Sequence, residues 1–85
     1  MSNKISIVDV RTPGEFMCGN VVDSINIPLQ ELHLRLEEIK TLPQPIILCC
    51  ASGIRSGQAA TFLQGIGVDC MNGGSWLDVN FKYQN

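Results

Sequence analysis

One short segment of the sequence carries the residue types that could do covalent chemistry. It begins with a cysteine and contains small residues and one basic residue, in the order Cys50, Ala51, Ser52, Gly53, Ile54, Arg55 and Ser56. A thiol between the end of a strand and the start of the next helix faces the partial positive charge and the unpaired N–H groups of that helix, which favour the thiolate. We therefore expect Cys50 to be a nucleophile at neutral pH.

The residues after Cys50 are suited to a loop that binds an anion. Ala51 and Ser52 have small side chains, and Gly53 can adopt backbone angles closed to other residues, so successive N–H groups can turn inward. Arg55 adds a positive charge five residues after the cysteine; it either contacts the anion or pairs with a carboxylate behind the loop. We expect this loop to hold an anion or a persulfide.

Two serines supply hydroxyl groups near the cysteine. Ser52 and Ser56 are placed to donate hydrogen bonds to sulfur, and Ser56 is also expected to cap the helix that follows the loop. The preceding residue, Cys49, ends a strand, so its side chain should lie on the opposite face from that of Cys50 and pack in the core. Only one of these two adjacent thiols is therefore expected to react.

The remaining cysteines are less informative, and either of them could resolve a persulfide if it lay near the loop. Cys18 and Cys70 complete a set of four cysteines without a paired C-x-x-C spacing, and His33 is the only histidine in the sequence. The sequence therefore predicts neither a disulfide framework nor a metal site. We expect His33 to be a surface residue, and Asp9 and Arg11 to form a structural polar pair near the loop.

The composition predicts one folded domain over residues 1–85. Hydrophobic residues make up 45% of the chain and charged residues 16%, which suits a packed core. The net charge of -2, without a Lys/Arg cluster, argues against nucleic acid or an anionic membrane as a partner. The segment Met1–Lys4 does not resemble the start of a secretion signal, and no apolar run approaches the roughly 20 residues that span a bilayer. We expect a soluble, cytoplasmic protein.

Apolar runs and turn signals predict alternating strands and helices. Runs typical of buried parallel strands lie at Ile5–Val10, Ser24–Ile27, Ile46–Cys49 and Val68–Met71. Helices are expected after a capping box at Thr12–Glu15 and ending near Gly19, over Leu29–Ile39, from Ser56 to about Gln64, and as a last turn from Ser75 after a turn at Asn72–Gly74. This order predicts an α/β fold with a mainly parallel four- to five-stranded sheet flanked by helices on both faces.

Four motifs along the chain follow one another in the order known from a single family. They are Val8–Phe16, Ser24–Pro28, Cys50–Ser56 and Asn72–Gly74. Together they resemble the rhodanese-like domain, a sulfurtransferase fold. The resemblance implies that Cys50 takes a sulfane sulfur from a donor such as thiosulfate, within a site formed by residues 51–56, and passes it to a thiophilic acceptor such as cyanide. Two displacements through a covalent persulfide require no metal or organic cofactor.

Loop length separates two chemistries within this resemblance. Phosphatases of the cell-cycle type share the fold but have a Cys-x5-Arg loop, whereas this chain has Cys-x4-Arg from Cys50 to Arg55. The smaller ring favours sulfur transfer over phosphatase or arsenate reductase activity. A third alternative is a non-catalytic binding or sulfur-relay module, in which Cys50 accepts sulfur only from a partner such as a thiol protein.

Overall fold

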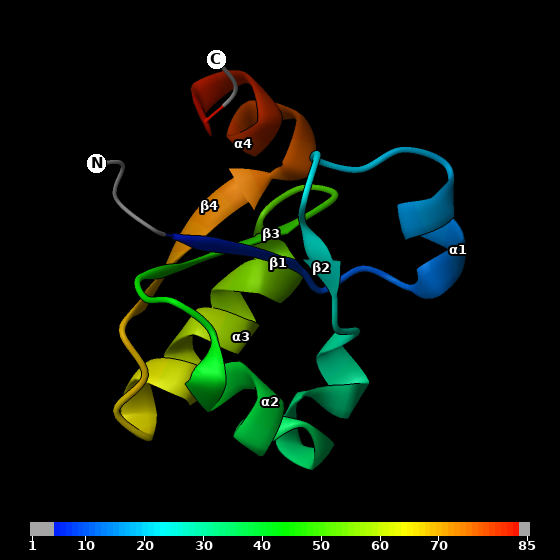
Figure 1. The fold of residues 1–85 in the computed structure, drawn as a ribbon. Coiled ribbons are helices and arrows are strands. Elements are labelled where there is room, and N and C mark those ends of the chain that lie inside the picture. The colour runs from blue at the N-terminus through cyan, green and yellow to red at the C-terminus, as the bar shows by residue number, and fades with distance from the viewer. Residues whose placement is uncertain (1–4, 84–85) are drawn as a thin grey trace.

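Four parallel strands form the sheet of the described residues, in the order β2-β1-β3-β4 (Figure 1). They are β1 (Ser6–Asp9), β2 (Ile25–Asn26), β3 (Ile46–Cys50) and β4 (Cys70–Ser75). The structure is a computed structural model that describes residues 5–83, and the segment Met1–Lys4, for which no secretion signal is predicted, lies outside them. The predicted α/β fold with a parallel sheet is confirmed.

Helices cover both faces of the sheet, as predicted. One face carries α3 (Ile54–Gly65), the 3₁₀ helix η1 (Leu29–Leu34) and α2 (Leu36–Thr41), which lie below the sheet in Figure 1. The other face carries α4 (Trp76–Tyr83). α1 (Pro13–Met17) lies to the side, beyond the end of β1. No helix in residues 5–83 is long and apolar enough to cross a membrane.

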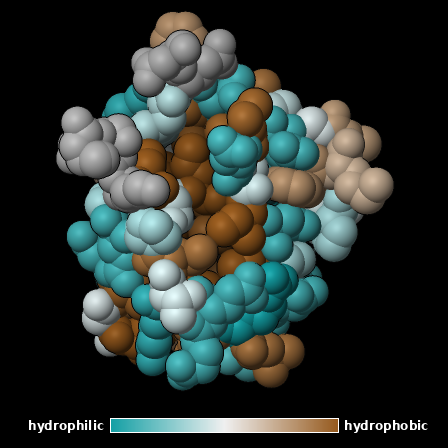
Figure 2. Space-filling model, in the orientation of Figure 1, coloured by the Kyte–Doolittle hydropathy of each residue, from teal (hydrophilic) through white to brown (hydrophobic). Residues whose placement is uncertain are grey.

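β3 is the centre of the core because both of its faces are buried. Ile46, Leu48 and Cys50 belong to the cluster on the side of α3, and Ile47 and Cys49 to the cluster on the side of α4, as the two-residue period of a strand requires. In Figure 2, a band of hydrophobic residues runs down the middle of the face shown, over the strands, with hydrophilic residues around it. The predicted opposite orientation of the two adjacent cysteines is thus confirmed.

α1 begins at a capping box, as the sequence predicts. The Thr12 hydroxyl accepts a hydrogen bond from the N–H of Glu15 at 3.2 Å, and the Glu15 carboxylate accepts one from the N–H of Thr12 at 3.0 Å. Pro13 occupies the first helical position, where the backbone N–H that proline lacks would have no partner within the helix. The box fixes Glu15 in the first turn of α1, from which its carboxylate reaches another helix, as described below.

The prediction of one amphipathic helix over Leu29–Ile39 is wrong. The segment forms η1 and α2, separated at Arg35, whose backbone angles of φ -123° and ψ 28° leave the helical range. Leu29 and Leu32 are three residues apart, a spacing that fits the three-residue turn of a 3₁₀ helix as well as an α-helix. The four-residue step that favours an α-helix, from Leu32 to Leu36, falls on the break.

β4 extends through the segment Asn72–Gly74, which the sequence predicts to be a turn. Asn72 pairs with Leu48 of β3, but the next residue of β3, Cys49, pairs with Gly74. Gly73 is therefore the extra residue of a β-bulge. A Cβ on Gly73 would lie 2.6 Å from Val79 Cγ2 and 2.7 Å from Ile47 Cγ2. The close approach of α4 to the strand, rather than a turn, therefore requires the glycine.

α4 is longer than the single turn predicted after Ser75. The Ser75 hydroxyl accepts a hydrogen bond from the N–H of Asp78 at 3.1 Å, so this residue opens the helix as expected. Val79 is buried between the helix and β3, in the same cluster as Ile47 and Cys49. This anchor on the sheet explains why the helix continues to Tyr83.

Replacing Gly73 with alanine should lower the free energy of unfolding by about 1–3 kcal/mol, because the added methyl group overfills the contact between β4 and α4. Gly14→Ala is the matched control, since nothing lies within 4 Å of a Cβ at that position. Urea unfolding followed by circular dichroism compares both variants with the parent protein. Equal stability of the Gly73→Ala protein would contradict the close contact described here.

Candidate active site

Cys50 is the last residue of β3, and the following loop closes over its side chain. The residue is 0% exposed, and only residues 51–53 separate β3 from α3. Gly53 precedes α3 in the left-handed region, at φ 101°, where a larger residue would be strained. Ser56 lies inside the first turn of α3, so the prediction that it caps the helix is wrong. The thiol is therefore covered from solvent in this structure.

Hydrogen-bond donors converge on the Cys50 sulfur. The N–H of Gly53 lies 3.0 Å from Sγ, and the N–H and the hydroxyl of Ser56 each lie 3.4 Å from it. These groups belong to the loop and to the first turn of α3, where helix N–H groups have no partner within the helix. The structure thus brings Cys50, Gly53 and Ser56 together around one sulfur atom.

The remaining loop residues surround the thiol mainly with backbone. Ala51, Ser52 and Ile54 are exposed, and the side chain of Ile54 adds an apolar group to the surface of the loop. The N–H of Ser52 also favours the thiolate of Cys50. The hydroxyl that bonds to the sulfur is that of Ser56. Short or outward-pointing side chains leave the N–H groups of this loop free to face the sulfur.

The two adjacent thiols differ in acidity because only one of them meets these donors. Burial raises the pKa of Cys50, but the hydrogen bonds from Ser56, Gly53 and Ser52 outweigh it and lower the pKa to about 7. Burial, together with the charge of Asp9, raises the pKa of Cys49 to about 12. At neutral pH, therefore, Cys50 is partly a thiolate whereas Cys49 remains a thiol.

Arg55 is paired with a carboxylate, one of the two possibilities that the sequence leaves open. Its guanidinium donates to both carboxylate oxygens of Glu15, at 2.8 and 3.0 Å, and so joins α3 to α1. The hydrogen bonds from Arg55 and then from Thr12 lower the pKa of Glu15 to about 2. Glu15 is therefore charged at neutral pH, and it cancels much of the positive charge that Arg55 brings to the loop.

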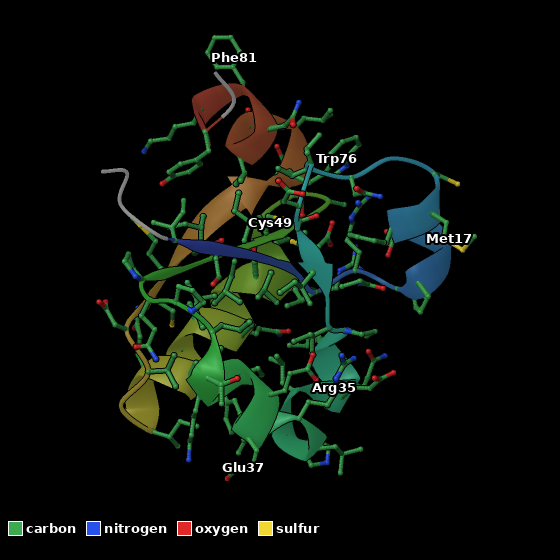
Figure 3. All side chains as sticks on the ribbon, viewed as in Figure 1. Met17, Arg35, Glu37, Cys49, Trp76 and Phe81 are labelled. Atoms are coloured by element: carbon green, nitrogen blue, oxygen red, sulfur yellow. The ribbon has the colours of Figure 1, made fainter. Side chains whose placement is uncertain are left out.

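A buried ion pair fixes the segment that carries α1. Arg11 and Asp9 are joined at 2.7 Å, with side chains that are 6% and 0% exposed. Arg11 also donates to the carbonyl of Gly19 at 2.7 Å and lies over the ring of Trp76, 4.8 Å from its centroid. Figure 3 shows Trp76 at the start of α4. The predicted structural pair is confirmed, and it ties the segment after α1 to the start of α4.

Asn72 belongs to the site although the sequence did not indicate it. Its Oδ1 accepts hydrogen bonds from the Ser56 hydroxyl at 2.7 Å and from the Gly74 N–H at 3.0 Å, and its Nδ2 donates to the Gly53 carbonyl at 3.0 Å. An Asn-Gly-Gly segment is typical of a turn, which hid this role. Glu15 was missed in the same way, because it was recognised only as part of a capping box.

The other thiols and the histidine lie outside this arrangement. Cys70 is buried, its thiol donates to the Ala60 carbonyl at 3.8 Å, and burial raises its pKa. Cys18 is exposed, and His33 is exposed on η1, as predicted. Within residues 5–83, no three His, Cys, Asp or Glu side chains lie together in a way that could hold a metal ion.

The fold and the site define a class of protein: a small parallel α/β domain with a cysteine beneath an N–H-lined loop at the end of a central strand. The family model described as the rhodanese-like domain matches residues 1–76. The chain belongs to the rhodanese-like domain family, which confirms the resemblance drawn from its motifs.

Similar proteins include a sulfurtransferase. The chain is 43% identical over 61 residues to the uncharacterized protein YqhL of Bacillus subtilis (strain 168), and the matched segment covers 72% of this chain and 48% of that protein. It is 35% identical over 65 residues to a sulfurtransferase of Allochromatium vinosum, and this matched segment covers 74% of this chain and 60% of that protein. A solved structure described as rhodanese with anions from E. coli is 31% identical, with a TM-score of 0.76 over 87% of this chain and 89% of that chain. The chain thus spans less than two thirds of either of the first two relatives, and the comparisons support a sulfur-transfer family.

Alkylation of the native protein should reveal one acidic thiol. We expect the iodoacetamide reaction of Cys50 to rise with pH around a midpoint of about 7, because the thiolate is the reacting form. Cys49 should stay unmodified over the same range, because its pKa is about 12. Peptide mass spectrometry after labelling between about pH 5 and pH 9 measures both sites. A Cys50 midpoint near 9, the ordinary value of a thiol, would show that the surrounding donors do not stabilise the thiolate.

Proposed function

We propose that this chain moves sulfane sulfur through a persulfide on Cys50, from a donor such as thiosulfate to a thiophilic acceptor such as cyanide. The observation that carries the proposal is the convergence of the Gly53 and Ser56 donors on the Cys50 sulfur, at 3.0 to 3.4 Å. Donors around an ionisable sulfur favour the thiolate, which is the form that attacks. Membership in a sulfur-transfer family supports the same reaction class.

Two displacements on sulfur complete the proposed cycle. In the first, the Cys50 thiolate attacks the sulfane sulfur of thiosulfate, a new S–S bond forms, and sulfite leaves with the electron pair of the broken S–S bond. In the second, cyanide attacks the terminal sulfur, thiocyanate leaves, and the Cys50 thiolate takes back an electron pair. Both steps balance without a proton transfer, a metal or an organic cofactor.

The loop has a further role in this cycle, which is to stabilise the persulfide. Loading moves the negative charge from Sγ to the terminal sulfur, one bond further from the strand. We assign the binding of this sulfur, and of the donor anion, to the loop residues by way of their N–H groups: Ala51, Ser52, Gly53, Ile54, Arg55 and Ser56. Fixed donors of this kind stabilise a developing charge without having to reorganise.

The partners and the location follow from burial and charge. Because Cys50 is 0% exposed, we propose that it exchanges sulfur with small anions or with the narrow persulfide end of a thiol protein. The net charge of -2 makes nucleic acid and anionic membranes unfavourable partners. We propose the cytoplasm as the location, since thiols there are kept reduced and able to accept sulfur.

The persulfide itself is the direct test of the proposal. After incubation with thiosulfate, the intact protein should gain one sulfur atom by mass spectrometry and lose it again on addition of cyanide. Cys50→Ser should fold, fail to gain the sulfur and lose thiosulfate:cyanide activity. Cys49→Ser is the matched control and should retain both properties, because Cys49 faces the opposite side of the sheet.

Three outcomes of this test separate the proposal from its alternatives. Full activity of the Cys50→Ser protein would refute the role of Cys50. A parent protein left unmodified by thiosulfate, but loaded by a persulfide-carrying protein, would favour a sulfur-relay module. Hydrolysis of an aryl phosphate that depends on Cys50 would favour phosphatase chemistry, which the Cys-x4-Arg loop disfavours.

Glu15→Gln should increase the use of thiosulfate, raising kcat/KM about two- to fivefold at low salt. Glutamine retains the capping box of α1 but has no charge to cancel that of Arg55. A dianionic donor then meets a more positive loop, so the gain should appear in KM and shrink as salt is added. Steady-state kinetics with thiosulfate at two ionic strengths measure this effect.

Glu38→Gln is the matched control for this experiment. Glu38 also forms a bidentate pair with an arginine, Arg35. This pair joins the end of η1 to α2 and does not involve the loop after Cys50. The control should leave the kinetics with thiosulfate unchanged. A loss of activity in the Glu15→Gln protein at every salt concentration would instead show that the pair serves to hold the shape of the loop.

A further inference from the structure

The Ser56 hydroxyl has one proton and two acceptors. Its oxygen lies 2.7 Å from Asn72 Oδ1 and 3.4 Å from Cys50 Sγ. A hydroxyl can donate only one proton, so at any moment it serves the amide oxygen or the sulfur. Ser56 is 0% exposed, so these two neighbours decide where its proton points.

The orientation of the Asn72 amide is fixed by two other hydrogen bonds. Oδ1 accepts the N–H of Gly74 at 3.0 Å, and Nδ2 donates to the carbonyl of Gly53 at 3.0 Å. If the amide were flipped, Nδ2 would face the N–H of Gly74 and Oδ1 would face the carbonyl of Gly53. Both contacts would be unfavourable, since the first pairs two donors and the second two acceptors. Asn72 therefore presents only an acceptor to Ser56. The short distance between the two oxygens is favourable only while the hydroxyl proton lies between them.

We propose that Asn72 is a positioning residue that competes with Cys50 for the hydroxyl proton of Ser56 and thereby opposes full ionisation of the nucleophile. When the proton turns to the thiolate, the oxygens of Ser56 and Asn72 face each other without a proton between them. That repulsion counts against the thiolate. The residue acts through Ser56 and does not itself touch the sulfur.

This competition suits the two-step sulfur transfer, on which the inference rests. An attacking thiol works best when its pKa lies near the ambient pH, since a more acidic thiolate is a weaker nucleophile. In the persulfide, Sγ no longer carries the charge, and the Ser56 proton can return to Asn72. The hydroxyl thus supports Cys50 when sulfur is absent and releases it when sulfur is loaded.

Other charged groups around Cys50 come from several elements and stay in place when Asn72 is changed. They are Asp9 at the end of β1, Arg11 just after it, Glu15 on α1, Arg55 on α3 and Asp78 on α4. The Cys49 thiol lies next to it on β3, and η1 and α2 contribute buried apolar side chains to the same cluster. The Gly53 carbonyl also accepts the Gly57 N–H at 3.0 Å, so the loop keeps one anchor without Asn72.

Asn72→Ala should therefore lower the apparent pKa of Cys50, whereas a purely structural loss would raise it. Water in the place of the exposed amide can donate to the Ser56 oxygen and leave the hydroxyl proton to the sulfur. We expect a fall of about half a pH unit, which is about a two- to threefold faster iodoacetamide reaction near pH 6. The pH profile of Cys50 alkylation measures this shift. A raised or unchanged pKa in a folded Asn72→Ala protein would overturn the proposal.

Further variants complete the experiment. Ser56→Ala should raise the pKa of Cys50, and adding Asn72→Ala to it should cause no further change, because Asn72 acts through Ser56. Asn72→Asp keeps the size, is a stronger acceptor and adds a negative charge, so it should raise the pKa more when Ser56 is present than in the Ser56→Ala background, where only its charge acts. This comparison keeps the test available if the alanine variant is unfolded. Met71→Ala, a neighbour on the other face of β4, should have no effect.

The readout separates this proposal from the sulfur-transfer function. Alkylation reports the ionisation of Cys50 whether or not a persulfide forms. If the pKa moves as expected but thiosulfate leaves the protein unmodified, the sulfur-transfer proposal fails and the role of Asn72 stands. If a persulfide forms but a shift caused by Asn72→Ala persists in the Ser56→Ala background, the role of Asn72 fails and sulfur transfer stands.

Discussion

The site depends on hydrogen-bond donors that surround a sulfur atom buried from water. Burial keeps a thiol protonated, as Cys49 shows, whose pKa burial and the charge of Asp9 raise to about 12. Cys50, the next residue of the same strand, is likewise closed to solvent, yet its pKa is about 7. The difference lies in the face of the sheet. One side chain meets the apolar cluster under α4, whereas the other meets the unpaired N–H groups at the start of α3.

Contacts between distant segments hold those donors in place. Gly53 takes a left-handed conformation that turns its N–H toward the sulfur. From one side, Arg55 is held by Glu15 of α1, which the buried pair of Asp9 and Arg11 helps to position. From the other side, the loop is held by Asn72. The β-bulge in β4 matters here because it changes the register of the strand at the point where Asn72 must face α3.

The features that the sequence predicted correctly are mostly local. Thr12 and Glu15 form a capping box within four residues, and the apolar run at Ile46 forms the buried central strand. The errors arise where tertiary contacts decide. The break at Arg35 separates two segments whose leucine spacing fits either helix type. The Arg55–Glu15 pair joins residues 40 apart, and the position of Asn72 depends on a register shift, so neither could be read from a short pattern.

The balance of charge at the loop bears on how such a site selects its reactants. Arg55 is neutralised by Glu15, and Asp78 adds a negative charge near Gly74, so the loop carries little net positive charge. Long-range attraction of anions is correspondingly weak, and salt screens what remains. In the proposed transfer, selection would therefore act at short range, through the N–H groups of the loop. Because the sulfur is covered, both size and hydrogen-bond geometry would contribute to that selection, and the same short loop covers the sulfur and supplies its donors.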